Sequence, residues 1–140
     1  IFVYEGGGTS IFGGIHSHQL NNNDDGTIDL NDINNGIRDC NDAHYPTSKL
    51  LCLENTHNLC YGAPIAEEYF NQIKKIVDKH NLKLHIDGAR IFNAAVALKT
   101  TVRNLAKNAD SISCCLSKGL ACPTGSLIIG KNPFLRTILQ

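Results

Sequence analysis

Two hydrophobic patterns alternate along the chain. Short apolar runs predict strands over residues 1–5, 49–55, 82–87, 111–116 and 125–130. Apolar residues at helical spacing predict helices over residues 30–38, 64–80, 90–98, 101–109 and 133–140. This alternation predicts an α/β fold with a mostly parallel sheet and right-handed crossovers.

The ends of these predicted elements carry recognisable signals. Pro64 is expected to open its helix, since proline suits the first helical turn. An Asn- and Asp-rich turn at 21–26 precedes the helix near 30–38, with Asp29 or Asn31 as its N-cap. Thr100 or Thr101 is a plausible cap before residues 101–109, and Gly6–Gly8 predict a bend after the first strand.

Polar side chains follow the buried strands where each strand ends. In open α/β sheets, ligands bind at this carboxyl edge. The residues expected there are Glu54, Asn55, Thr56, His57, Asp87, Arg90 and Lys118.

Composition narrows the functional classes. The 140 residues are 42% hydrophobic and 19% charged, with a formal net charge of zero, which argues against a nucleic-acid-binding surface. No apolar run approaches the roughly 20 residues that span a bilayer. Six cysteines without C-x-x-C spacing predict free thiols in a reducing compartment, and therefore a cytoplasmic protein.

Two of the residues expected at the carboxyl edge suggest a catalytic or cofactor-binding role. Lys118 follows an apolar run and precedes small residues, so it either reaches solvent or, if partly desolvated, is a neutral amine that can form a Schiff base. Asp87 in "HIDGAR" either begins a helix and pairs with Arg90 or faces a ligand cation. An aspartate and a Schiff-base lysine together suit a pyridoxal phosphate ring, whose nitrogen needs a carboxylate.

Three segments in this order, "LENTHN" (53–58), "HIDGARIFNA" (85–94) and "CLSKGLACPTGS" (115–126), resemble threonine aldolases. These are fold-type-I pyridoxal-phosphate enzymes with a three-layer α/β/α large domain. The resemblance implies retro-aldol cleavage of L-threonine or L-allo-threonine to glycine and acetaldehyde, in a homotetramer. The open alternatives are another fold-type-I lyase or aminotransferase, and a folded piece that binds no cofactor by itself.

The same resemblance assigns roles to four residues. Lys118 would bind the cofactor covalently, and Asp87 would partner the pyridine nitrogen. Arg90 would lie near the ring hydroxyl and the substrate carboxylate. His44, in "AHYP", would lie beside the substrate β-hydroxyl as a general base, or else be a surface-loop histidine. No metal site is expected, since no histidine or cysteine pair has the spacing of a known motif.

The resemblance also implies what this sequence does not contain. The chain has no methionine and its last residues continue a helical pattern, so residues 1–140 are expected to be the middle of a longer protein. They would form part of the cofactor-binding large domain. The phosphate-binding loop and a ring-stacking histidine would precede Ile1, and a small C-terminal domain would follow Gln140.

Overall fold

A computed structural model describes residues 2–131, which form two compact units. The first unit comprises residues 2–21 and 28–48, and the second comprises residues 22–27 and 49–131. The second unit contains the sheet.

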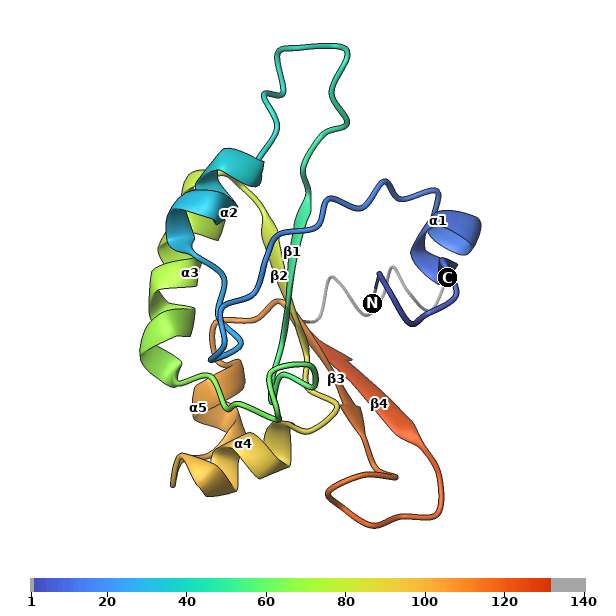
Figure 1. The fold of residues 1–140 in the computed structure, drawn as a ribbon, viewed down its shortest axis with the longest axis vertical. Helices are drawn as coiled ribbons and strands as arrows, with labels where there is room; N and C mark the ends of the chain where they lie inside the picture. Colours follow the sequence, from blue (N-terminus) through green and yellow to red (C-terminus); the bar gives the residue numbers. More distant parts are fainter. Residues whose placement is uncertain (1, 132–140) are drawn as a thin grey trace. The chain divides into compact units, whose positions relative to one another are not determined.

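The sheet has four strands in the order β1-β2-β3-β4 (Figure 1). The strands are β1 (Leu50–Glu54), β2 (Lys83–Asp87), β3 (Ser111–Cys115) and β4 (Ser126–Gly130). The first three pair in parallel, and β4 pairs antiparallel to β3. The predicted α/β class with a mostly parallel sheet is confirmed, and all four strands lie within their predicted ranges.

Three helices connect the parallel strands of this unit. Helix α3 (Glu67–Lys79) lies between β1 and β2, and α4 (Ile91–Ala97) with α5 (Val102–Ala106) lies between β2 and β3. Both crossovers step in the same direction along the sheet, and their helices lie on the same face of it (Figure 1). Thr101 caps α5, since its side chain accepts a hydrogen bond from the Asn104 N–H.

Side chains of β2 alternate between a buried face and an open face. On β2, Leu84 and Ile86 are fully buried, whereas His85 and Asp87 between and beyond them are partly exposed. The apolar residues on the helix side form the core with the inner faces of α3, α4 and α5. Its main members are Leu53, Phe70, Ile73, Val77, Leu84, Ile86, Ile91, Ala94, Leu105 and Ile112. The sequence pattern of β2 therefore already separates core residues from candidate site residues.

Helix α3 begins later than the sequence predicts. Its N-cap is Ala66, so residues 64–66 precede the helix. The Asn55 side chain explains the shift: its Oδ1 accepts from the Ile65 N–H and its Nδ2 donates to the Ile65 carbonyl, both at 3.0 Å. These two hydrogen bonds hold the Ile65 backbone to Asn55 ahead of the first helical turn.

The first unit contains two short helices, α1 (Gly8–Gly13) and α2 (Leu30–Gly36). Asp29 caps α2 through a 2.7 Å hydrogen bond from the Asn31 N–H, as predicted. The strand predicted over residues 1–5 is wrong for its described part, since residues 2–5 form an exposed turn. Gly6 and Gly7, with φ of 58° and 72°, turn the chain directly into α1, which the sequence pattern did not reveal. The helix predicted over residues 133–140 lies outside the described residues.

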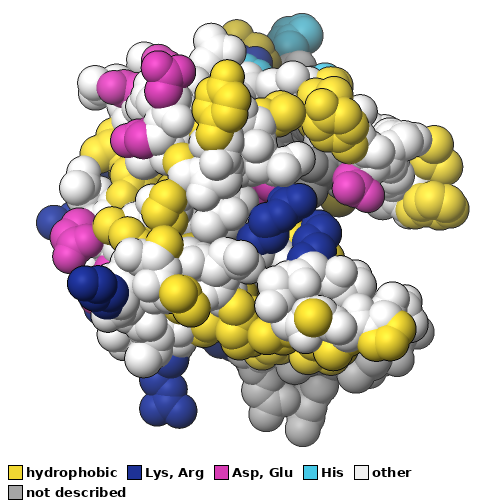
Figure 2. All heavy atoms as spheres, turned by 60° about the horizontal axis from the view of Figure 1, so that its bottom comes forward, with side chains coloured by type: hydrophobic (Ala, Val, Ile, Leu, Met, Phe, Trp, Pro, Cys, Tyr) yellow, Lys and Arg dark blue, Asp and Glu magenta, His cyan; other side chains and the backbone are white. Residues whose placement is uncertain are grey.

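Hydrophobic side chains also reach the surface, as the yellow spheres in Figure 2 show. On the edge strand β4, Leu127, Ile128 and Ile129 are each about half-exposed, at 48%, 50% and 51%. Both faces of β4 are therefore open within the described part of the chain. In residues 2–131, no helix has the length and apolarity that a membrane crossing requires.

Asp110 joins three strands at the opposite end of the sheet from the carboxyl edge. Its carboxylate accepts a 3.0 Å hydrogen bond from the Leu84 N–H and lies 3.5 Å from Lys83 Nζ and 3.8 Å from Lys131 Nζ. Partial burial raises the pKa of Asp110, but the Leu84 hydrogen bond and the two lysine charges outweigh it and leave the pKa below its usual value. The ionised carboxylate therefore stabilises the start of β2 and β3.

Replacing this carboxylate should weaken the sheet. We expect Asp110→Asn to lower the free energy of unfolding by about 1–2 kcal/mol at neutral pH. Because the folded-state pKa is lowered, the ionised group stabilises the fold above about pH 4, and this contribution is lost as the pH falls through the folded-state pKa. Denaturant unfolding of wild type and variant at neutral and acidic pH measures this. The exposed Asp24→Asn is the control, and an equal deficit at both pH values would contradict the assignment.

Candidate active site

The carboxyl ends of β1, β2 and β3 meet at one edge of the sheet. Glu54 pairs with Asp87 in the strand register, and Asp87 pairs with Ser113. The backbone continues this ladder beyond the strands, since the Asn55 N–H donates to the Asp87 carbonyl at 2.9 Å. The predicted gathering of polar residues at this carboxyl edge is confirmed for the residues that follow β1 and β2.

Asp87 and Arg90 lie three residues apart without pairing. One Asp87 oxygen accepts a 3.1 Å hydrogen bond from the Ala89 N–H, and Arg90 is the N-cap residue of α4 without a side-chain capping bond. No ion pair within 4.0 Å involves either residue in the part of the chain that the structure describes. The alternative of an Asp87–Arg90 pair is therefore wrong, and both charges remain available to a ligand.

Gly88 holds the Asp87 turn tightly against β3. Its N–H donates to the Ser113 carbonyl at 2.8 Å. A Cβ at this position would lie 2.7 Å from that carbonyl oxygen and 2.8 Å from Ile112 Cδ1. Any other residue would therefore push the turn, and with it Asp87, away from β3.

The segment after β1 is structural rather than available to a ligand. Asn55 and Thr56 are buried, and the Asn55 amide is occupied by Ile65. His57 is also buried, and the Cβ that Gly26 lacks would lie 2.7 Å from the His57 Cβ. Glu54 turns toward this loop, since its Oε1 accepts from the Asn58 N–H at 3.2 Å. The "ENTHN" segment therefore stabilises the loop after β1 through its buried side chains and hydrogen bonds.

Lys118 lies in the loop between β3 and β4. The strand ends at Cys115, so Lys118 is exposed in this chain and not at the buried strand end that the apolar run predicted. Its carbonyl accepts from the Ala121 N–H at 2.9 Å, which closes a tight turn. It makes no ion pair with any residue from 2 to 131. The amine is thus open to a carbonyl compound.

The loop that carries Lys118 contacts helix α4. A Cβ built on Gly119 would lie 2.1 Å from the Asn93 Oδ1 atom, so the Asn93 side chain lies directly on this glycine. Asn93 lies three residues after Arg90, on the same face of the first turn of α4. Asn93 was missed by sequence reasoning; its spacing from Arg90 was the only available signal.

His85 lies on the same open face of β2 as Asp87. Its Nδ1 is 2.8 Å from the Ser111 Oγ on the neighbouring strand. Burial lowers the pKa of His85, and the nearby charge of Asp87 only partly opposes this. His85 is therefore neutral at neutral pH and ties β2 to β3. No group of three potential metal ligands exists among residues 2–131.

His44 belongs to the first unit. Its side chain is 94% exposed, and its Nδ1 lies 2.8 Å from Asp42 Oδ1. The same carboxylate oxygen accepts the His44 backbone N–H at 2.9 Å, and these two hydrogen bonds keep the pKa of Asp42 below its usual value. An Asp42-bound Nδ1–H leaves Nε2 as a hydrogen-bond acceptor when His44 is neutral.

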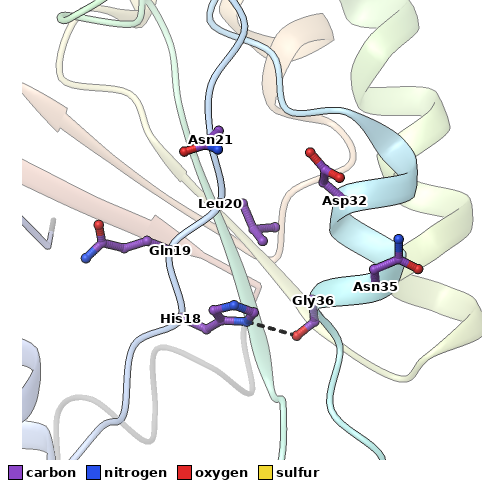
Figure 3. A pocket seen from close by; sticks show the side chains of 7 residues that line it. All are labelled: His18, Gln19, Leu20, Asn21, Asp32, Asn35 and Gly36. Carbon is purple, nitrogen blue, oxygen red and sulfur yellow. Dashed lines mark hydrogen bonds between the residues drawn. The ribbon is translucent and has the colours of Figure 1, made fainter.

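The first unit also has a pocket of its own. It is lined by His18, Gln19, Leu20, Asn21, Asp32, Asn35 and Gly36 (Figure 3). The His18 Nδ1 lies 3.1 Å from the Gly36 carbonyl, which ties the segment before residue 21 to the end of α2. None of the predicted site residues lies in it.

The whole chain, residues 1–140, matches the family model described as beta-eliminating lyase. The chain belongs to the beta-eliminating lyase family. Within it, the chain is 48% identical over 136 residues to the Arabidopsis thaliana protein named low-specificity L-threonine aldolase 1, covering 96% of this chain and 38% of that protein. It is 37% identical over 139 residues to the Escherichia coli K12 low specificity L-threonine aldolase, covering 99% and 40%.

The fold of this lyase-family chain is shared with solved structures. A threonine aldolase structure from Leishmania major superposes with a TM-score of 0.71 at 23% identity, covering 94% of this chain and 40% of that one. This likeness supports the α/β fold. The chain thus spans about two fifths of the length of the relatives it matches.

Three charged side chains of the second unit indicate which chemical groups of a ligand could bind to them. Asp87 is a carboxylate that can bind a cation, Arg90 is a planar cation suited to a carboxylate, and Lys118 is an amine that can attack a carbonyl. None of them is neutralised by another described residue. Each of the three groups could bind one matching ligand group: a protonated nitrogen, a negative oxygen or an aldehyde.

The close contact of Gly88 gives a direct test of this geometry. We expect Gly88→Ala to lower the free energy of unfolding by about 1–3 kcal/mol, since its Cβ would overlap the Ser113 carbonyl. Gly8→Ala in α1 is the matched control, because its Cβ would meet nothing closer than 3.9 Å. Denaturant unfolding measures both, and equal stabilities of the two variants would contradict the packing described for Gly88.

Proposed function

We propose that the full-length protein is a pyridoxal-phosphate-dependent aldehyde-lyase that cleaves L-threonine and L-allo-threonine to glycine and acetaldehyde. The observation that carries this proposal is the set of unpaired charges on Asp87, Arg90 and Lys118 at and beyond the carboxyl edge. The choice of threonine and allo-threonine as substrates is supported by similarity to proteins named low-specificity L-threonine aldolases.

The residues present fit pyridoxal phosphate. Asp87 has one oxygen bound to the Ala89 N–H and another left for the pyridine nitrogen. Lys118 is accessible to the aldehyde, and Arg90 has no ion-pair partner among the described residues. When bound, the cofactor supplies an electron-accepting ring for the carbon–carbon cleavage.

Each residue then has a distinct task. Lys118 would hold the cofactor through its amine. Asp87 would face the pyridine nitrogen, where its negative charge favours the protonated ring. Arg90 binds the substrate carboxylate through its guanidinium fork and so orients the amino acid.

His44 is the proposed base for the β-hydroxyl proton. Asp42 holds its Nδ1–H, so Nε2 is left to accept that proton, directly or through water. Loss of this proton turns the hydroxyl oxygen into the carbonyl oxygen of acetaldehyde as the Cα–Cβ bond breaks. The imidazolium that forms is stabilised by the Asp42 carboxylate.

We also propose that the full-length protein is a cytoplasmic homotetramer. All six cysteines lie within the described residues and are free, which supports a reducing compartment. Size measurement of the full-length protein in solution tests the tetramer, and a monomer would contradict it.

Removing the Lys118 amine should abolish covalent cofactor binding. We expect the full-length Lys118→Ala variant to lack the near-visible absorbance band of lysine-bound pyridoxal phosphate. Lys75→Ala is the control, because this exposed lysine on α3 should leave the band unchanged. A Lys118→Ala protein that keeps the band would contradict the assignment.

The reaction is tested by product analysis of the wild-type protein. We expect glycine and acetaldehyde in equal amounts from both L-threonine and L-allo-threonine. Formation of α-keto acids in their place would indicate an aminotransferase or a β-eliminating activity and would overturn the proposed reaction.

Loss of the histidine should affect the chemical step and spare cofactor attachment. We expect His44→Ala to lower kcat for threonine by about 10²-fold, the usual contribution of a general base. Asp42→Asn should also lower kcat, because its amide no longer favours the required tautomer. Full activity of His44→Ala would contradict the role of His44, and His16→Ala, at an exposed histidine, is the control.

A further inference from the structure

The loop over residues 38–48 carries His44, and Arg38 closes it at its base. This loop lies between α2 and β1 in the sequence. The Arg38 N–H donates to the Ser48 Oγ at 3.0 Å, which joins the first and last residues of the loop. Arg38 and Ser48 are both partly buried, whereas the residues between them are exposed apart from Asp42. The two ends of the loop are therefore fixed to each other.

The side chain of Arg38 makes a second contact within this loop. Its guanidinium carbon lies over the Tyr45 ring, 5.4 Å from the ring centroid. A cation within about 6 Å of a ring centroid is attracted by the negative face of the ring. Arg38 makes no ion pair with any residue from 2 to 131, so no carboxylate competes with Tyr45 for its charge. Arg38 thus contacts both the end of the loop and the residue that directly follows His44.

Tyr45 and His44 belong to the same tight turn. The Tyr45 N–H donates to the Asp42 carbonyl at 3.1 Å, and the His44 N–H donates to Asp42 Oδ1 at 2.9 Å. A long 3.4 Å hydrogen bond from the Asp42 N–H to the Asp39 carbonyl leads toward the start of the loop. In the described part of the chain, no hydrogen bond joins this turn to a residue outside the loop. The contact of Arg38 with Tyr45 therefore links the turn to the base of the loop.

We propose that Arg38 is a positioning residue for His44: its guanidinium holds the Tyr45 ring and so fixes the turn that carries His44 relative to the base of the loop. Arg38 acts through Tyr45 and needs no contact with substrate or cofactor. This inference rests on the proposed function, since the position of His44 matters to the reaction only if His44 accepts the β-hydroxyl proton. Loss of either the cation or the ring would release the turn, whereas a variant that keeps both would not.

Four variants of the full-length protein test this contact, each assayed for glycine release from L-threonine. The kcat is expressed per lysine-bound cofactor, measured from its absorbance band, so that unfolded protein does not enter the value. We expect Arg38→Ala and Tyr45→Ala each to lower kcat about threefold with KM unchanged, a ratio in the range of an exposed cation–π contact. Arg38→Lys keeps a cation and Tyr45→Phe keeps the ring, so both should retain the wild-type kcat. If either were as slow as the alanine variants, the assignment of this contact would be wrong.

Double variants decide whether Arg38 acts through Tyr45 and His44. We expect Arg38→Ala to cause no further loss of kcat when His44 or Tyr45 is already alanine. A merely structural role would not depend on His44, so a further threefold loss in the His44→Ala background would overturn the proposal. A wild-type kcat in Arg38→Ala alone would also overturn it. Arg103→Ala, at an exposed arginine on α5, is the control and should have the wild-type kcat.

Failure of this proposal and failure of the proposed function give different results. Wild-type protein that releases no glycine from L-threonine would refute the proposed function and this inference with it. Full activity of His44→Ala would refute the role of His44, on which the inference depends. If wild type and His44→Ala behave as proposed and Arg38→Ala keeps the wild-type kcat, only the positioning role of Arg38 is refuted.

Discussion

The parallel pairing of β1, β2 and β3 is the constraint on which the rest of the structure depends. It brings the ends of three strands to one edge, and the Asn55 and Gly88 N–H groups extend the ladder past the last strand residues. The chain turns directly afterwards, since the Ala89 N–H donates to the Asp87 carboxylate and the Ile91 N–H donates to the Gly88 carbonyl. This turn leads into α4 and so fixes Arg90 and Asn93 together with Asp87.

Side chains alternate along β2, so the residues that stabilise the fold and the residues of the candidate site lie on opposite faces of this strand. Leu84 and Ile86 face the helices and are fully buried, while His85 and Asp87 face the open side. Burying large apolar side chains provides the main driving force for this unit. The charged residues of the site then remain without protein partners, which makes them available to a ligand.

Local patterns predicted the elements that depend on local signals. The apolar runs of β1 to β4 and the mostly parallel sheet could be predicted from the sequence, and Asp29 and Thr101 were each one of two cap candidates. The start of α3 could not, because it depends on the Asn55 side chain, ten residues away from Ile65. The contact of Asn93 with Gly119 depends likewise on how a helix and a distant loop meet. Residues 2–5 were predicted wrongly because an apolar run forms a strand only where a neighbouring strand pairs with it.

We propose that the cofactor attaches to Lys118, in the loop between β3 and β4. Asp87 and Arg90 supply two further charges without an ion-pair partner among residues 2–131. The most direct measurement is borohydride reduction of the full-length protein with pyridoxal phosphate, followed by protease digestion and mass spectrometry. We expect the reduced cofactor on Lys118, and its attachment to a different lysine would contradict this assignment.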